Sequence, residues 1–446
     1  MIIQYEKHRV NGKGINMKDL NRKIKVGYIG LGRRGLGVLT RNVAKMKDVE
    51  VKMVCDLSDE RLEEARKNVL ERSGHEPLLT KNYRDVLNDP EIEAVFIMIG
   101  WTGRPTMAIE SMRAGKYTAI EVGCADTVDE CYALVDAYEE TGVPVMMLEN
   151  CCYDRREMVA LNVVEQGLLG EVVHCTGAYM HNLNECEFFK DMDGDGKMHY
   201  RLPLYMTKNR ENYPTHAFGP ICKVLGINRG NRITKLVSVA SKSRGIKSYA
   251  ARHFGADNEY AKIDYKQGDI VNTILTCEGG ETIQLTLDTT LPRSYYSRNF
   301  GIRGTEGYVD EARKVVWFES MGGHSCIAES VTDNEEEMFK KYDHPLYQQY
   351  LAEGVEDEGS HSSMDWLVCR AFFEAVRKGI NTPIDAYDAA LWLSVGPLSE
   401  RSINEGGSAV EVPDFTRGKW ANREPAPECK YSLAKVCSEP ETPIHL

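Results

Sequence analysis

Three glycines and one acid near the N-terminus have the types and spacing that bind a dinucleotide. Gly30, Gly32 and Gly35 form a Gly-x-Gly-x-x-Gly motif. Gly30 permits a tight turn, Gly32 lets the backbone approach a pyrophosphate, and Gly35 lets the following helix pack on the preceding strand. The N–H groups at the start of that helix would hold the pyrophosphate. Asp56 follows the next apolar stretch, where a carboxylate binds ribose hydroxyls and repels a 2′-phosphate, so the pattern predicts NAD rather than NADP.

Two arginines within the motif leave a second interpretation open. Arg33 and Arg34 occupy its last two variable positions. A guanidinium can hold the 2′-phosphate of NADP, and it can equally clamp the pyrophosphate. A solvated pair of surface charges is the third possibility.

Strands and helices must alternate to position these residues. The motif lies between an apolar stretch and an amphipathic stretch, which are typical of a strand and a helix. Thr127 and Glu130 form a capping box for a helix that Gly142 ends. This rhythm predicts a parallel sheet in a Rossmann domain over residues 23–150, after an N-terminal extension of residues 1–22. The strands are expected at 23–29, 49–55, 94–99, 117–122 and 143–148, and helices at 59–70, 105–114 and 127–142.

The pattern changes after residue 150. Alternating apolar residues predict strands separated by turns such as Gly279-Gly280. We expect an α+β domain with an open, mostly antiparallel sheet over residues 151–410, and an extended tail over residues 411–446 that wraps on the surface. Its strands are expected at 172–180, 233–239, 269–277, 282–289 and 300–304, and its helices at 158–168, 365–378 and 386–393.

Composition excludes several functional classes. The 446 residues are 42% hydrophobic and 27% charged, with a formal net charge of −12, which argues against nucleic acid or an anionic membrane as partner. No apolar run approaches the length of a membrane span, and residues 1–21 lack the features of a signal peptide. Thirteen cysteines without CxxC spacing predict reduced thiols, no metal site and a cytoplasmic location.

One acidic stretch imitates a calcium loop. Asp191, Asp193, Asp195 and Gly196 match the start of an EF-hand, but its twelfth position is Leu202 rather than Glu. Because that glutamate completes the ligand set, we expect a solvated turn within residues 191–197.

Several longer segments carry a family resemblance. The chain resembles the glucose-fructose oxidoreductase/inositol dehydrogenase/MocA superfamily and, within it, glycoside hydrolase family 109, the NAD-dependent α-N-acetylgalactosaminidases. The similarity extends from about residue 23 to residue 413. The matching segments are MLENCCY at 147–153, GAYMH at 177–181, NYPTH at 212–216, INRG at 227–230 and VGPLSE at 395–400.

The resemblance implies a glycosidase that works without two facing carboxylates. NAD takes hydride from C3 of the sugar, and the new ketone acidifies the proton on C2. A base removes that proton, the aglycone is eliminated from C1, and water adds to the double bond. The same NADH then reduces the ketone, so the cofactor stays tightly bound and is regenerated in each turnover.

The resemblance also implies the site residues. His216 and Tyr213 become the acid/base candidates, and Tyr179 is a third catalytic candidate. Tyr213 and His216 lie three residues apart, ahead of a helix expected near Pro220. Each candidate also has a purely structural interpretation. His216 could be a buried histidine at the start of a helix, Tyr179 and Tyr295 could be aromatic core residues, and Arg201 could be a surface charge. The implied substrate-binding residues are Tyr179, Arg201, Tyr213, Pro214, Thr215, His216 and Tyr295. The implied cofactor-binding residues are Gly30, Gly32, Arg33, Arg34, Gly35, Asp56, Trp101, Thr102, Gly103, Arg104, Glu121, Val122 and Asn150.

Departures from relatives affect the substrate and the reaction. Dehydrogenases of the superfamily carry Glu-Lys where this chain has Glu121-Val122, so the lysine that handles the alcohol proton is missing. Tyr200 stands where the hydrolases usually have Trp. A small glycoside is therefore the expected substrate, and the sugar stays open. The alternatives are an NAD-dependent oxidoreductase of 3-keto-glycosides and an NAD-bound sugar sensor. Because the second sheet needs a cover, a homodimer or homotetramer is expected.

Overall fold

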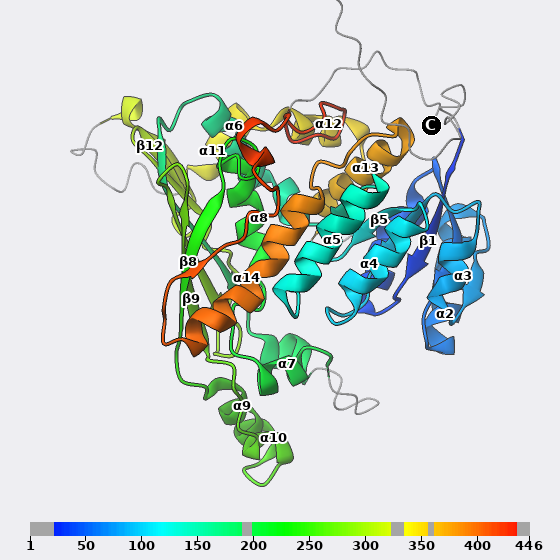
Figure 1. Cartoon of the computed structure of the whole chain (residues 1–446), viewed down its shortest axis with the longest axis horizontal. Coiled ribbons are helices and arrows are strands. Elements are labelled where there is room, and N and C mark those ends of the chain that lie inside the picture. Colours follow the sequence, from blue (N-terminus) through cyan, green and yellow to red (C-terminus); the bar gives the residue numbers. More distant parts are fainter. Residues whose placement is uncertain (1–21, 190–198, 323–333, 356–360, 435–446) are drawn as a thin grey trace, which may run out of the picture.

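The computed structural model describes residues 22–189, 199–322, 334–355 and 361–434, which form two sheets with helices packed between and around them (Figure 1). The acidic stretch at 191–197 lies outside these residues. So do the tail beyond residue 434 and, apart from Arg22, the predicted N-terminal extension.

The first sheet is parallel and has six strands in the order β3-β2-β1-β4-β5-β6, which confirms the predicted Rossmann fold. Its central strands are buried on both faces because helices cover both sides, so they read as continuous apolar runs. The strands are β1 (Ile24–Ile29), β2 (Val49–Cys55), β3 (Leu78–Thr80), β4 (Ala94–Ile97), β5 (Tyr117–Ile120) and β6 (Val145–Met147). The helices are α1 (Arg33–Arg41), α2 (Asp59–Ser73), α3 (Tyr83–Asn88), α4 (Arg104–Arg113) and α5 (Val128–Thr141).

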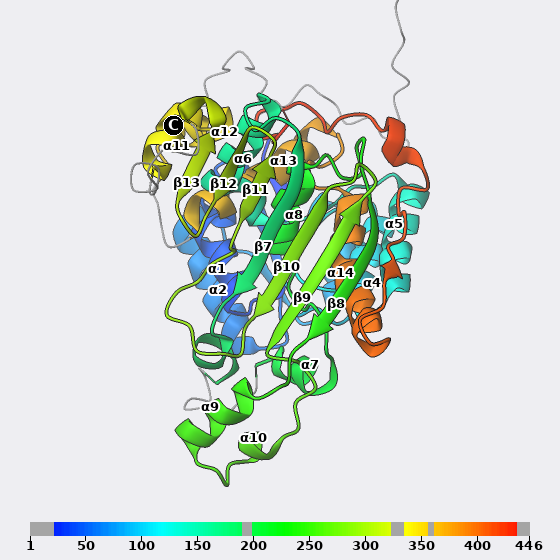
Figure 2. The ribbon, with the colours of Figure 1, turned by 90° about the vertical axis from the view of Figure 1, so that its left-hand side faces the viewer.

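The second sheet has eight strands in the order β13-β12-β11-β7-β10-β9-β8-β14 and is antiparallel except between β7 and β10. Helices α8 and α14 pack against one face, and no helix lies over the other face in Figure 2. The strands are β7 (Val172–Met180), β8 (Ile233–Ala240), β9 (Ile270–Cys277), β10 (Thr282–Asp288), β11 (Gly301–Gly304), β12 (Gly307–Asp310), β13 (Val315–Phe318) and β14 (Val410–Glu411).

Nine further helices complete the described chain. They are α6 (Arg155–Glu165), α7 (Leu202–Thr207), α8 (Thr215–Val224), α9 (Gly245–Phe254), α10 (Glu259–Lys262), α11 (Glu335–Tyr342), α12 (Pro345–Glu353), α13 (Ser362–Lys378) and α14 (Ala386–Asn404). In the part of the chain that the structure describes, no helix combines the length and apolar composition needed to cross a bilayer.

Two prolines misled the prediction of helix bounds. Helix α8 begins at Thr215 rather than near Pro220, so His216 lies in its first turn and Pro220 lies inside it. Helix α14 continues past Leu393 and through Pro397 to Asn404. Proline removes only one hydrogen bond from a helix interior, and tight burial of both helices outweighs that loss.

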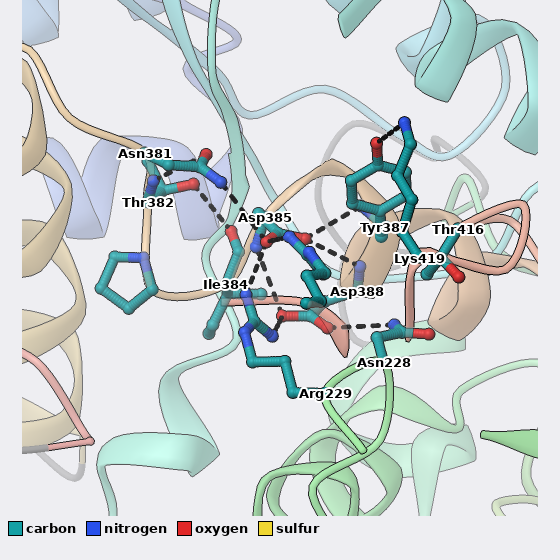
Figure 3. Close-up of polar contacts among 12 residues, drawn as sticks. Asn228, Arg229, Asn381, Thr382, Ile384, Asp385, Tyr387, Asp388, Thr416 and Lys419 are labelled. Atoms are coloured by element: carbon teal, nitrogen blue, oxygen red, sulfur yellow. Dashed lines mark hydrogen bonds and ion pairs between the residues drawn. The ribbon is translucent and has the colours of Figure 1, made fainter. Parts of the chain in front are cut away.

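A buried charge network ties the start of α14 to α8 and to the C-terminal segment. Figure 3 shows Asp385, Asp388 and Arg229 of this network. Asp385 caps α14 and accepts hydrogen bonds from the guanidinium groups of Arg229, at 2.6 Å, and Arg423. Asp388 accepts from Lys223 at 2.6 Å and from Arg229 at 3.4 Å. Burial alone would raise the pKa of Asp388, but these cations hold it well below its usual range. The network therefore fixes α8, which carries His216, against α14.

The C-terminal segment is more firmly anchored than the predicted extended tail on the protein surface. Its first residues form β14, which pairs with β8. Beyond it, Phe415, Tyr431 and Leu433 are buried, and Arg423 reaches the network at Asp385. A few buried side chains thus anchor the described part of the predicted tail, while residues 417–419 and 421–422 between them are exposed.

Candidate active site

The glycine loop between β1 and α1 has the shape that a pyrophosphate needs. Gly30 has φ +95°, and a Cβ there would lie 2.8 Å from the backbone of Met98. A Cβ on Gly35 would lie 2.2 Å from the carbonyl oxygen of Gly30. A Cβ on Gly32 would instead project into open space, and no side chain caps the start of α1. The loop therefore presents free N–H groups beside unfilled space, which fits the phosphates of NAD.

Asp56 fixes this loop from the end of β2. Its carboxylate accepts hydrogen bonds from the N–H of Leu31 at 2.7 Å and from that of Ser58 at 3.0 Å. A carboxylate offers about four acceptor positions, so Asp56 retains acceptors for the ribose hydroxyls.

The two arginines of the motif are paired with carboxylates from distant segments. Arg34 binds Glu121 at 3.0 Å and forms two hydrogen bonds with Asp365 of α13, at 2.6 and 2.7 Å. Asp365 also accepts from Asn150 at 2.8 Å. Arg33 forms an ion pair with Glu187. The Arg34 guanidinium is therefore fully engaged, whereas the Arg33 side chain is 59% exposed and pairs with Glu187 through one nitrogen.

The segment after β4 contains one residue with an unused hydrogen-bond donor and others that hold the backbone together. The Trp101 ring is buried, and its Nε1–H has no partner among the described residues. Arg104 donates to the backbone carbonyls of Ile99, at 2.7 Å, and of Glu121 and Val122, at 2.5 and 2.7 Å. It thus joins the ends of β4 and β5. Gly103 precedes α4 with φ +77°, and Thr102 contacts Asp126.

An aromatic cluster from both sheets lies next to this segment. Tyr213 has its ring centroid 4.3 Å from that of Tyr179 on β7, 5.0 Å from that of His216 and 5.8 Å from that of Trp101. Burial raises the pKa of Tyr179 to about 12 and that of Tyr213 well above its usual value. Both phenols therefore stay protonated and can donate hydrogen bonds. The structure thus brings together the predicted Tyr179, Tyr213 and His216.

Arg201 covers the same cluster. Its guanidinium carbon lies 4.7 Å from the centroid of the Tyr213 ring, 5.3 Å from that of Trp101 and 5.6 Å from that of Tyr200. It donates to the Tyr200 hydroxyl at 3.1 Å and forms no ion pair with the described residues. An arginine stacked on three rings is not a plain surface charge, and its remaining donors suit a polar ligand.

Glu149 was not predicted as a site residue, although it orients His216. Its Oε1 lies 2.7 Å from Nδ1 of His216 and accepts the N–H of Cys151 at 3.0 Å. Burial alone would raise the pKa of Glu149, but His216 outweighs burial and lowers it. An ionised Glu149 keeps the proton of a neutral His216 ring on Nδ1 and leaves Nε2 able to accept one. Two sequence signals pointed to it: an acid directly after an apolar strand, and its place in the family-matching segment at 147–153.

Tyr295 lies apart from this cluster. Its side chain is 64% exposed and packs against Arg293. The ring of the next residue, Tyr296, lies 6.0 Å from that of Tyr179 and 5.5 Å from that of His181. Among the other predicted substrate contacts, Pro214 and Thr215 form the buried start of α8, between Tyr213 and His216.

The fold and the glycine loop define the class of protein first. Residues 24–149 match the family described as "Oxidoreductase family, NAD-binding Rossmann fold". A levoglucosan dehydrogenase solved in complex with NADH and levoglucosan has a TM-score of 0.62 and 18% identity to this chain, over 88% of this chain and all of that one. A myo-inositol 2-dehydrogenase from Lactobacillus plantarum gives 0.59 and 17% over the same shares. These structures share the fold.

The second half identifies the family. Residues 153–422 match "Glycosyl hydrolase 109, C-terminal domain". An α-N-acetylgalactosaminidase from Tannerella forsythia is 36% identical over 90% of this chain and 88% of its own length. A glycosyl hydrolase family 109 protein from Phocaeicola vulgatus is 35% identical over 90% of this chain and 96% of its own length. The chain belongs to glycosyl hydrolase family 109, and it is an NAD-dependent glycosidase. The predicted family, fold and cofactor are thereby confirmed, and a sugar oxidoreductase is not favoured.

Proposed function

We propose that this glycosidase cleaves small glycosides of N-acetylgalactosamine or a similar sugar by transient oxidation at C3, elimination, water addition and reduction. The observation that carries the proposal is the Glu149–His216 pair, which lies beside two protonated tyrosines. Asn150, next to Glu149, is linked through Asp365 to Arg34 of the loop that fits NAD. The sugar is suggested by the name of the Tannerella forsythia relative. Bound NAD would supply hydride acceptance and return at C3.

His216 moves the proton in this proposal. Glu149 holds Nδ1, and Nε2 has no partner among the described residues. The neutral ring can therefore accept the C2 proton on Nε2, and the buried carboxylate stabilises the imidazolium that forms. Val122, at the end of β5, offers no amine for this task, which leaves the proton transfer to His216.

The aromatic cluster orients the sugar and supports the negative charge that develops on it. Tyr179 and Tyr213 keep their hydroxyl protons and can donate to the oxygen that becomes the enolate. Arg201 adds a positive charge over the Tyr213 ring. Tyr179 and Tyr213 are buried and Arg201 is half-buried beside them, so their electrostatic effect is stronger than it would be in water.

Turnover in deuterated water tests the elimination. Chromogenic α- and β-glycosides are hydrolysed by the NAD-loaded protein, and the released sugar is analysed by NMR. We expect deuterium at C2 because His216 exchanges its proton with solvent before returning it. Hydrolysis with protium retained at C2 would exclude this mechanism.

A second measurement separates hydrolysis from net oxidation of the sugar. Absorbance at the nicotinamide band is followed while the aglycone is released. We expect many turnovers for each bound cofactor and no accumulation of NADH. Extraction of denatured protein should also release about one NAD(H) per chain, as tight binding requires. NADH formed in proportion to the sugar consumed would favour a 3-keto-glycoside oxidoreductase.

We propose that two or four chains associate through the open face of the second sheet. Ile274 of β9 pairs with Val237 of β8, and Val239 lies two residues further on the same face. Val239 and Ile274 are 53% and 40% exposed, and such apolar side chains favour a covered interface. Light scattering should give a dimer or tetramer for the wild type and a smaller mass for Ile274→Glu.

We propose a cytoplasmic location on the evidence of the thiols. The eleven described cysteines are all free, and all but Cys186 are buried. Reduced thiols in this number suit a reducing compartment. Fractionation of producing cells should find the protein with cytoplasmic markers.

A further inference from the structure

Three different metal-ligating side chains meet at the base of the aromatic cluster. A carboxylate oxygen of Glu149, the sulfur of Cys151 and a ring nitrogen of His216 all lie within 4.8 Å of one another. A cation midway between two atoms at that limit would be about 2.4 Å from each. Zinc–ligand bonds are about 2.0–2.3 Å long, so small side-chain adjustments would complete the set.

The surrounding backbone holds these ligands ready. Glu149 and Cys151 flank Asn150 at the end of β6, where the Cys151 N–H donates to Glu149 at 3.0 Å. His216 comes from the first turn of α8, and its Nδ1 already faces Glu149 at 2.7 Å. Its side chain is 14% exposed, whereas that of Glu149 is fully buried. Access from solvent is therefore on the His216 side.

The charges nearby can accommodate a cation bound to a thiolate. Arg298 lies 3.6 Å from the Cys151 sulfur, where it favours the thiolate. That guanidinium is itself matched by Glu157 at 2.6 Å and Asp154 at 2.8 Å. The metal-free thiol keeps its proton because burial raises its pKa well above the usual value. Zinc would displace that proton, as it does at other thiolate sites.

We propose that Glu149, Cys151 and His216 form a binding site for one thiophilic divalent cation, with Zn²⁺ as the expected ion. The thiol proton leaves to solvent, and the ion binds the thiolate, a carboxylate oxygen and Nδ1 of His216. Three protein ligands leave a fourth position for water or for an oxygen of the substrate. Sulfur, imidazole and carboxylate together select zinc over magnesium or calcium.

Occupancy would stop turnover, and this consequence rests on the proposed function. A metal on Nδ1 leaves the ring proton on Nε2, so His216 can donate a hydrogen bond but can no longer accept the C2 proton. The ion also replaces the hydrogen bond to Glu149. Zn²⁺ therefore acts as a reversible inhibitor that a chelator removes.

Cobalt substitution tests the site without relying on activity. Co²⁺ is titrated into the NAD-loaded protein, and the sulfur-to-cobalt charge-transfer band and the tetrahedral visible bands are recorded. We expect one equivalent of thiolate-bound Co²⁺ per chain, displaced by Zn²⁺. Cys151→Ser should abolish the sulfur band and weaken Zn²⁺ binding by more than about 10-fold, because even second-shell changes cost 10- to 100-fold.

The neighbouring cysteine provides the matched control. Cys152 is equally buried and adjacent but is not one of the three ligands, so Cys152→Ser should keep the full cobalt spectrum. Glu149→Gln is the second ligand variant, used if Cys151→Ser does not fold. A sulfur band that persists in both ligand variants, or that Cys152→Ser also removes, would overturn the site.

Inhibition is measured separately with the same proteins. We expect Zn²⁺ to stop wild-type hydrolysis and a chelator to restore it, while Cys151→Ser tolerates at least 10 times more Zn²⁺. Normal hydrolysis by a fully zinc-loaded wild type would overturn the inhibitory role of the metal but not the existence of the metal site. A wild type that binds cobalt through sulfur but hydrolyses no glycoside after a chelator has removed the metal would contradict the proposed function alone.

Discussion

The network at Asp385 and Asp388 and the cluster around His216 are both buried and polar, but they differ in how completely their groups are paired. Arg229 and Arg423 bind Asp385, and Lys223 and Arg229 bind Asp388. The cluster around His216 contains groups without such partners among the described residues.

Three groups illustrate this shortage of partners in the cluster. Within the described part of the chain, Arg201 lacks a carboxylate, the indole N–H of Trp101 has no acceptor, and Glu211, two residues before Tyr213, lacks a cation. A buried polar group left unpaired costs about 1–3 kcal/mol. The carboxylates of Asp385 and Asp388 are thus matched by cations and serve stability, although Nε of Arg229 and Nη1 of Arg423 have no partner among the described residues. Around His216 the arginine and the glutamate named above themselves lack a counter-ion among those residues, and there we expect a ligand to bind.

The largest expected effect is on stability, from breaking the paired network. Asp388→Ala leaves Lys223 and Arg229 without one of their carboxylates and should lower the free energy of unfolding by about 3–5 kcal/mol. Turnover per folded, NAD-loaded molecule should stay at the wild-type value. Denaturant unfolding and specific activity measure the two quantities. The control is Glu411→Ala, which removes an exposed ion pair with Lys235 and should cost less than about 1 kcal/mol.

The reverse pattern is expected for His216→Ala. Turnover should fall by about 10²-fold or more, the usual loss of a positioned acid/base, while the free energy of unfolding changes little. Tyr213→Phe should give a smaller defect, and the double variant should be non-additive. Kinetics per folded, NAD-loaded molecule are the measurement. A destabilised variant with normal specific activity would make His216 a structural residue.

Two substitutions in the glycine loop should have separate effects, one on NAD binding and one on folding. Gly32→Ala adds a Cβ that meets no protein atom within 4 Å, so the free energy of unfolding of the NAD-free protein should hardly change. The methyl group would enter the space beside the α1 N-terminus and weaken NAD binding by about 10-fold, or roughly 1.4 kcal/mol. Gly30→Ala is the contrasting variant because it strains the backbone at φ +95° and should destabilise the fold itself. Calorimetric titration with NAD distinguishes them, and equal NAD affinity in Gly32→Ala and wild type would contradict the proposed loop contact.

The last effect concerns an unpaired carboxyl and appears only as the pH rises. Burial raises the pKa of Glu211 to about 8, above its unfolded value, so the folded state keeps a proton that the unfolded state loses. Its contribution to stability is therefore complete at pH 4 and is lost as pH rises toward 8. Glu211→Gln should match the wild type near pH 4 and exceed it by on the order of 4 kcal/mol at pH 8, because each pKa unit is worth about 1.4 kcal/mol. Unfolding curves at several pH values check this, and a constant difference across that range would exclude the titration.

Local patterns predicted much of the fold because burial repeats with the period of each element. The predicted bounds of β2 and β7 match the structure. As expected, the Thr127 capping box begins α5 and Gly142 ends it. The exposed strand β3 was missed because Leu78 and Leu79 lie on the surface and show no buried pattern. The bounds of α8 and α14 were wrong because long-range packing outweighed the local effect of proline.

The sequence by itself determined the glycine loop, the acid after β2, the family and the residue types available for proton transfer, since these depend on neighbours along the chain. Only the tertiary structure decided which of them pair. Arg34 meets Asp365 across 331 positions, and His216 meets Glu149 across 67. It also placed Tyr296, rather than the exposed Tyr295, beside Tyr179. Long-range pairing depends on how the two sheets and their helices pack, and no spacing within a single segment encodes it.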